Sequence, residues 1–84
     1  MLRIVVESRE GVSTVRAEGQ MIGPWVDEVR RSCEELQRAG IEPTVDLARV
    51  SFVDREGVEL LRTLTSRGVA VVNCSGFVTE LLRG

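Results

Sequence analysis

The spacing of hydrophobic residues changes along this chain, and that change constrains the fold more than any other feature. β-branched residues are frequent in residues 2–6 and 12–17, which is typical of strands. The segment between them, residues 7–11, is polar and ends in glycine, so the two strands are predicted to form a hairpin. Beyond residue 20 the hydrophobic residues recur every three or four positions, which is typical of amphipathic helices. The chain is therefore expected to begin with a hairpin and to continue with helices alternating with strands.

The first helix is predicted to begin at Gly23-Pro24, because proline is favoured at the first position of a helix. One face of this helix is hydrophobic, and its residues are Trp25, Val29, Cys33 and Leu36. The residues between them carry charges of both signs, so the opposite face is expected to be solvated. Gly40 suits the end of the helix and Pro43 cannot extend it. Residues 44–47 are then predicted to form a short strand.

The second half of the chain repeats this alternation. Residues 48–54 are predicted to be a connector, and Asp54 is expected to cap a second helix that ends at Gly68. The inward-facing residues of this helix are predicted to be Val58, Leu61 and Leu64. Residues 69–73 are the most uniformly apolar of the predicted strands and are predicted to be buried on both faces. Ser75 is expected to cap a last short helix, which contains Phe77, Val78, Leu81 and Leu82.

The predicted order is β-β-α-β-α-β-α. A hairpin followed by βαβ crossovers predicts a mixed sheet, antiparallel within the hairpin and parallel elsewhere, with helices packed on it. The 84 residues suffice for one modest core. We therefore expect a single small α/β domain over residues 1–84.

The sequence offers little catalytic or metal-binding chemistry. It contains no histidine, the usual general base and the commonest metal ligand. Cys33 and Cys74 lack metal-ligand spacing and are expected to fill the core. The acidic residues that could supply paired catalytic carboxylates are Asp46, Asp54, Glu56 and Glu59. Asp54 and Glu56 flank a helix start, where negative charge is stabilising, and no phosphate-binding glycine motif is present. We expect no catalytic residue, no metal and no cofactor.

Charge and hydropathy limit the classes of partner. The net charge of −2 and the scattered positions of the arginines argue against nucleic acid. No segment approaches the roughly 18 apolar residues that span a bilayer, and residues 1–6 are too short for the hydrophobic region of a signal peptide. We therefore expect no membrane insertion, a cytoplasmic location and reduced thiols.

Residues 45–58 form the most distinctive segment. It resembles the signature of the STAS family, which includes anti-sigma factor antagonists and the cytoplasmic tails of sulfate transporters. The matching residues are Asp46-Leu47, Ser51-Phe52-Val53-Asp54, and Gly57 with the following Val58, Leu60 and Leu61. The resemblance extends over most of the chain, because the hairpin and the order of helices also agree with the family. Glu18-Gly19 is in addition similar to the family's Gly-Glu-Leu-Asp region.

This resemblance implies a protein-binding module without catalytic activity. The partner-binding residues that it implies are Ser51, Asp54, Arg55, Glu56 and Gly57. In the family the residue after the Asp is a phospho-accepting serine, whereas here it is Arg55, followed by Glu56 where a second Ser or Thr is usual. The chain also stops at Gly84, where longer members add a strand and a helix. Phosphorylation switching at position 55 is therefore not expected.

Several alternatives remain open from the sequence. One alternative is a domain that binds an anti-sigma factor or kinase-like protein, and a second is an accessory subunit of a transporter or another assembly; a homodimer also fits. A third alternative is a small enzyme or ligand-binding protein that uses Asp54 and Glu56. Phe52 and Val53 suit either the core or an interface, and Trp25 favours the core. Arg55 is expected to make an external contact, with Glu56 as its local counter-charge.

Overall fold

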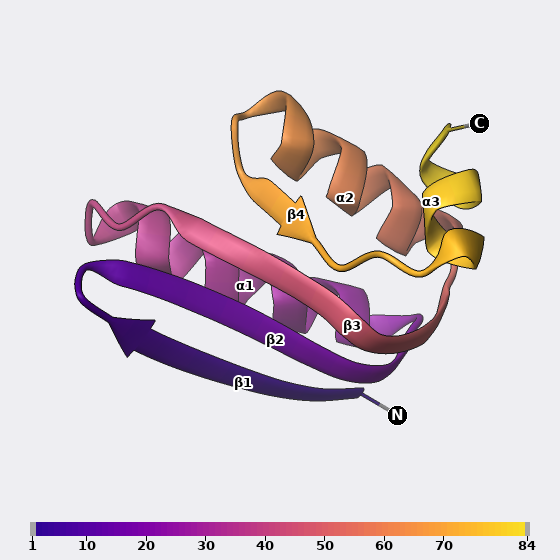
Figure 1. The fold of residues 1–84 in the computed structure, drawn as a ribbon, viewed down its shortest axis with the longest axis horizontal. Coiled ribbons are helices and arrows are strands. Elements are labelled where there is room, and N and C mark those ends of the chain that lie inside the picture. The colour runs from indigo at the N-terminus through magenta and orange to yellow at the C-terminus, as the bar shows by residue number, and fades with distance from the viewer. Residues whose placement is uncertain (1, 84) are drawn as a thin grey trace.

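The computed structural model describes residues 2–83, and within them a mixed sheet is covered by helices (Figure 1). The elements are β1 (Leu2–Arg9), β2 (Val12–Met21), α1 (Pro24–Arg38), β3 (Pro43–Val53), α2 (Arg55–Ser66), β4 (Ala70–Val72) and α3 (Gly76–Arg83). This order confirms the predicted β-β-α-β-α-β-α arrangement of a single small α/β domain.

The strands lie side by side in the order of the sequence, β1-β2-β3-β4. β1 and β2 pair antiparallel, whereas β2–β3 and β3–β4 pair in parallel. The hairpin turns at Glu10 and Gly11, whose φ angles are 52° and 80°; glycine adopts this left-handed conformation without steric cost. Helices α1 and α2 pack against one face of the sheet (Figure 1). The opposite face carries no helix from the described residues and is called the open face below.

The core lies between the sheet and the two long helices. Valine, leucine and alanine side chains from β2 and β3 pack against α1. The buried residues of α1 are Val26, Val29 and Cys33, each of which is at most 1% exposed. Val29 and Cys33 confirm the predicted face of α1, but Trp25 and Leu36 are only half-buried at its margin. In α2 the predicted Leu61 and Leu64 are buried together with Gly57 and Leu60, and Val58 is half-buried. The spacing of hydrophobic residues therefore predicted the buried face of each of these two helices to within about one residue.

The prediction for residues 69–73 was wrong in two respects. The strand β4 is only three residues long, and it lies at the edge of the sheet with β3 as its one described neighbour. Ala70 and Val72 are exposed, and only the preceding Val69 is well buried, at 3% exposure. A short apolar run does not reveal whether both faces of a strand are covered, and here the open face leaves alternate residues in contact with solvent.

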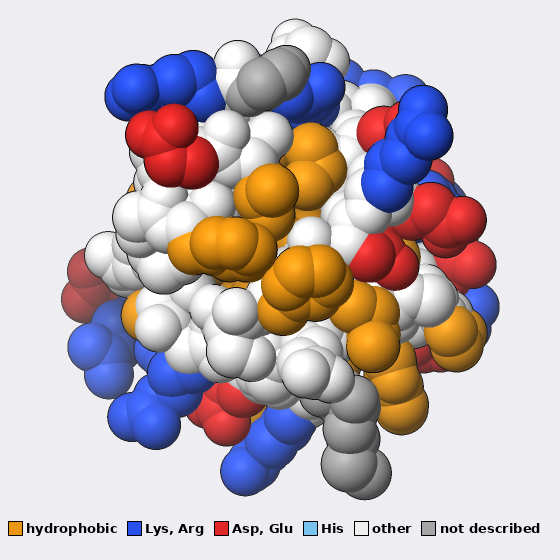
Figure 2. All heavy atoms as spheres, turned by 90° about the vertical axis from the view of Figure 1, so that its right-hand side faces the viewer, with side chains coloured by type: hydrophobic (Ala, Val, Ile, Leu, Met, Phe, Trp, Pro, Cys, Tyr) orange, Lys and Arg blue, Asp and Glu red, His pale blue; other side chains and the backbone are white. Residues whose placement is uncertain are grey.

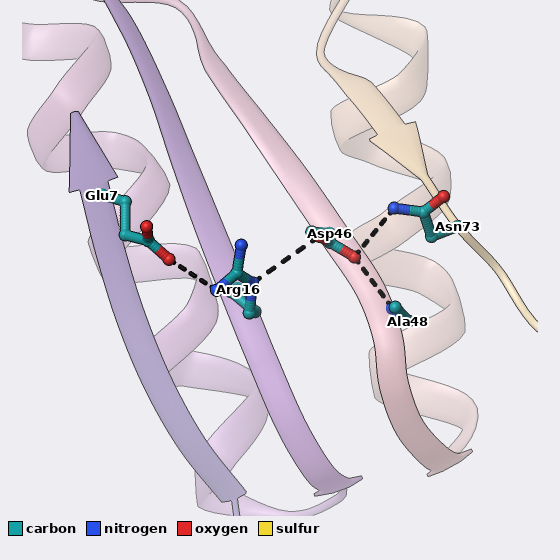
Figure 3. A network of polar contacts seen from close by, with 5 residues as sticks. All are labelled: Glu7, Arg16, Asp46, Ala48 and Asn73. Carbon is teal, nitrogen blue, oxygen red and sulfur yellow. Dashed lines mark hydrogen bonds and ion pairs between the residues drawn. The ribbon is translucent and has the colours of Figure 1, made fainter. Parts of the chain in front are cut away.

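A polar network crosses the open face from β1 to the end of β4 (Figure 3). Arg16 on β2 forms ion pairs with Glu7 on β1 and with Asp46 on β3. The same Asp46 carboxylate accepts hydrogen bonds from the Ala48 N–H at 2.9 Å and from the Asn73 side-chain amide at 3.2 Å. The Ala48 N–H lowers the pKa of Asp46 from its ordinary value; Asn73 and Arg16 act in the same direction, and burial opposes them. Charged and polar groups therefore link β1, β2 and β3 with the segment that follows β4 on this face.

Candidate functional site

The segment predicted as a connector is the second half of β3, and two irregularities in its pairing with β2 shape the site. In the second of these, Gly19 lies opposite Val50 and Gln20 opposite Phe52, so Ser51 is an extra residue. The Ser51 hydroxyl donates a hydrogen bond to the Gly19 carbonyl at 3.2 Å. Such bulges bend a strand and redirect the side chains that follow. The two irregularities therefore determine which way the last side chains of β3 point.

The bulge at Ser51 separates the roles of the next two residues. Val53, opposite Met21, points into the core and is 2% exposed, whereas Phe52, opposite Gln20, is 41% exposed. The question left open by the sequence is thus resolved differently for each residue: Val53 belongs to the core and Phe52 to the surface.

Asp54 connects the beginnings of two helices. Its Oδ1 accepts a hydrogen bond from the Gly57 N–H at 2.8 Å, which caps α2 as predicted. Its Oδ2 accepts a second hydrogen bond, also at 2.8 Å, from the N–H of Gly23, which precedes α1. The Asp54 N–H in turn donates to the Met21 carbonyl at 3.1 Å. A carboxylate at a helix start satisfies free N–H groups and interacts favourably with the helix dipole, so Asp54 fixes the ends of β2 and β3 against both helices.

Gly57 is required by packing. It is buried, and a Cβ atom at this position would lie 2.5 Å from Cγ1 of Val53 and 3.1 Å from the carbonyl oxygen of Met21. Both neighbours are themselves buried at the ends of their strands. Glycine therefore allows the first turn of α2 to approach the sheet closely, and this residue supports the site from beneath without being accessible to a partner.

Arg55 and Glu56 point away from the protein. The Arg55 side chain is 93% exposed, and its Nε lies 3.6 Å from Oε1 of Glu59, one turn further along α2. The counter-charge of Arg55 is thus Glu59 and not Glu56, because residues four apart share one side of a helix. Neither Arg55 nor Glu56 has a role in the core, so both are available to a partner.

Phe77 completes the site and was not assigned to it from the sequence. Its ring centroid lies 5.9 Å from that of Phe52, and it is 51% exposed. The Ser75 hydroxyl accepts a hydrogen bond from the Val78 N–H at 3.1 Å, so the predicted cap of α3 is present. This cap begins α3 with Val78 buried and Phe77 outward. We call Phe52 and Phe77 the aromatic pair.

Hydrophobic side chains gather at this end of the molecule, between charged groups (Figure 2). Large apolar groups exposed together and surrounded by polar residues are typical of protein-binding surfaces. The site is thus composed of the aromatic pair and the β3–α2 junction, which we define as residues 51–57. The clue in the sequence was that two of its few aromatic residues lie close to proposed helix starts.

The carboxylate and thiol side chains determine whether the described residues could hold a metal ion or supply a nucleophile. Among residues 2–83 no group of three or more His, Cys, Asp or Glu side chains is placed to hold a metal ion. Cys33 is fully buried, and burial raises the pKa of its thiol to about 11; Cys74 is half-buried and its pKa is also raised by burial. Both thiols are therefore protonated near neutral pH and are poor nucleophiles. No helix in the described part of the chain is long and apolar enough to cross a membrane.

Comparison with known proteins identifies the fold. No protein-family model and no curated protein matches the sequence. Among solved structures, the anti-sigma factor antagonist SpoIIAA in its unphosphorylated form aligns with a TM-score of 0.72 at 18% identity, over 96% of this chain and 82% of that chain. The phosphorylated form of the Bacillus cell fate determinant SpoIIAA aligns with a TM-score of 0.71 at 19% identity, over 96% and 81%.

A third structure agrees with these two. An anti-sigma factor antagonist from Mycobacterium paratuberculosis aligns with a TM-score of 0.68 at 14% identity, over 100% of this chain and 96% of that chain. All three alignments cover nearly the whole chain. The chain therefore has the SpoIIAA-like fold of the STAS domains, as the resemblance of residues 45–58 predicted.

Proposed function

We propose that this protein is a non-catalytic interaction domain resembling the anti-sigma factor antagonists, and that it binds a regulatory protein through the β3–α2 junction, the following helix α2 and the aromatic pair. The observation that carries this proposal is the aromatic pair, in which Phe52 and Phe77 remain 41% and 51% exposed although they contact each other. Two neighbouring exposed aromatic rings supply a large apolar contact area, the kind that contributes most at protein interfaces.

The charges beside the aromatic pair suit a polar rim. Arg55 is held by a single exposed ion pair with Glu59, and exposed pairs of this kind contribute little to stability. Arg55 can therefore leave Glu59 for a carboxylate of a partner at small cost. Because arginine forms two parallel hydrogen bonds with a carboxylate, the favoured contact is an acidic side chain of the partner that lies next to an apolar surface.

The same residue argues for binding that phosphorylation does not control. SpoIIAA is known in phosphorylated and unphosphorylated forms, and Arg55 stands where the family carries its phospho-accepting serine. Arg55 has no hydroxyl to modify. The nearest hydroxyl, that of Ser51, is engaged with the Gly19 carbonyl within the strand pairing. We therefore propose that the partner preference of this domain is fixed by a permanent positive charge at position 55.

Replacement of Arg55 by serine is expected to weaken binding by about tenfold or more while leaving stability within about 0.5 kcal/mol of the wild type. The partner is first recovered with the wild-type protein as bait, then purified, and its affinity is measured by calorimetry. The matched control is Arg67→Ser, at the opposite end of α2, where another exposed arginine follows the helix; this variant should bind normally. Equal affinities of both variants and the wild type would remove Arg55 from the interface.

A further inference from the structure

The strand β1 is a long and unprotected edge of the sheet. All eight of its residues pair with β2 without a register shift, and it contains neither proline nor glycine. No described element lies beyond it (Figure 1). The other edge, β4, is only three residues long. Exposed edges present unpaired N–H and C=O groups that can pair with another strand, and proteins usually shorten, bend or cover them. β4 is shortened, whereas β1 has no such protection apart from its charged side chains.

Backbone geometry limits how two copies of β1 can pair. In an edge strand the N–H and C=O groups of alternate residues point outward. Two residues directly opposite each other in an antiparallel pair either both direct these groups toward the partner strand or both direct them away from it. In a symmetric pair of identical strands, a residue therefore faces one whose number differs from its own by an even amount. The two-fold axis must pass through a residue, and Ile4, Val5 and Val6 are the central choices.

The charges of β1 select one of these registers. With the axis at Val5, Arg3 of each copy faces Glu7 of the other, so two opposite-charge pairs form, each with a Glu7 that also pairs with Arg16 of its own chain. With the axis at Val6, Arg3 would face Arg9, and the two positive charges would repel each other. With the axis at Ile4, Arg3 would face Val5 and form no ion pair. Opposite charges directly across a strand pair are stabilising and like charges are destabilising. Arg3 has no ion-pair partner within residues 2–83, so it is free to form this pair.

The hydrophobic residues of β1 agree with the same register. Ile4 and Val6 point toward the helix side of the sheet, as their neighbours Ala17 and Val15 on β2 do. Val6 is 46% exposed although it lies on this side. With the axis at Val5, Val6 of each copy lies opposite Ile4 of the other, which covers the exposed apolar surface. Charge and apolar burial therefore favour one arrangement.

We propose that a second copy of this chain pairs antiparallel with β1 about Val5, which joins the two sheets into one. One strand, β2, separates this edge from β3, whose end belongs to the β3–α2 junction. The dimer therefore leaves both junctions accessible, and the proposal stands independently of the partner-binding function.

Sedimentation equilibrium over protein concentrations up to about 1 mM tests this pairing, since small interfaces associate weakly. The wild type is expected to dimerise. Arg3→Glu should raise the dimer dissociation constant by about tenfold or more, because two attractive pairs become repulsive. The double variant Arg3→Glu/Glu7→Arg restores both cross-strand pairs with reversed signs but places an arginine beside Arg16, so it should dimerise more tightly than Arg3→Glu without reaching the wild-type affinity. The control Arg49→Glu makes the same change in net charge at an exposed residue of β3 and should have no effect.

Cysteine cross-linking tests the register in a Cys74→Ser background. Opposite residues of an antiparallel pair have Cα atoms about 4.5–5.5 Å apart, within the range that a disulfide requires. Val5→Cys is therefore expected to form a disulfide-linked dimer on oxidation. Glu7→Cys should not, because the two copies of residue 7 would be four residues apart along the strand, or about 13 Å.

A wild-type protein that remains monomeric at all concentrations would overturn the proposal. So would a dimer that Arg3→Glu leaves unchanged, a double variant that fails to recover, or equal cross-linking at positions 5 and 7, since each would place the contact elsewhere. If the β1 amides were protected only when a strand from a different protein pairs with them, the occupant of this edge would be that protein, and this result would also overturn the proposal.

Discussion

Replacement of Val29 by aspartate is expected to leave the domain largely unfolded. Val29 is fully buried on the face of α1 that packs against the sheet. A carboxylate there would lie among the residues of the hydrophobic core, and the burial of an unpaired charge is among the most destabilising changes known. We expect a loss of more than about 4 kcal/mol, which is comparable to the whole stability of a small domain. Circular dichroism with urea titration measures this loss directly.

The same substitution on the surface provides the control. Val12 at the start of β2 is 54% exposed, so Val12→Asp should change the free energy of unfolding by no more than about 1 kcal/mol. If Val29→Asp unfolded cooperatively at the wild-type urea midpoint, the hydrophobic face of α1 would not be its buried face and the packing of α1 on the sheet would be wrong.

Gly57→Ala is expected to destabilise the domain by about 1–3 kcal/mol, although alanine is the better helix former by about 1 kcal/mol. The reason is the close approach of α2 to the ends of β2 and β3. An added Cβ would lie 2.5 Å from Cγ1 of Val53, which is 2% exposed and has little space into which it can move. Thermal and urea unfolding monitored by circular dichroism measure the loss.

Gly76 gives the matched comparison for Gly57. It lies in the first turn of α3, and a Cβ there meets no atom within 4 Å, so Gly76→Ala should be neutral or stabilising. A second check is Val53→Ala, which removes the clashing methyl group. The cost of Gly57→Ala should be smaller in that background, and the difference is the coupling energy of the two positions. Equal effects at Gly57 and Gly76 would show that the start of α2 is not closely packed.

The features that could be predicted from the sequence are those set by local chemistry. The spacing of hydrophobic residues gave the order of the elements, and Asp54 and Ser75 cap the helices that their positions indicated. The positive φ angles of Gly40 and Gly68, 77° and 88°, agree with their predicted places at helix ends. Capping and left-handed termination depend on a few neighbouring residues, and the sequence contains that information directly.

The features that escaped prediction depend on contacts between distant segments. The bulge at Ser51 is defined only by the pairing of β3 with β2, so the sequence alone did not show that Phe52 and Val53 face opposite ways. The edge position of β4 follows from the order of the strands, which a short apolar run does not reveal. The hydrogen bond from Gly23 to Asp54 joins residues 31 apart, and the contact between Phe52 and Phe77 likewise needs the folded arrangement of β3 and α3.

The most direct test of the proposed function is backbone hydrogen exchange of this protein, measured free and in complex with its purified partner. The proposed interface predicts slower exchange on binding at the β3–α2 junction, residues 51–57, and in the first turn of α3 around Phe77. The open face, including residues 12–16 of β2, should be unchanged. Slower exchange confined to the open face, with the junction unaffected, would contradict the claim that this domain binds its partner through the β3–α2 junction and the aromatic pair.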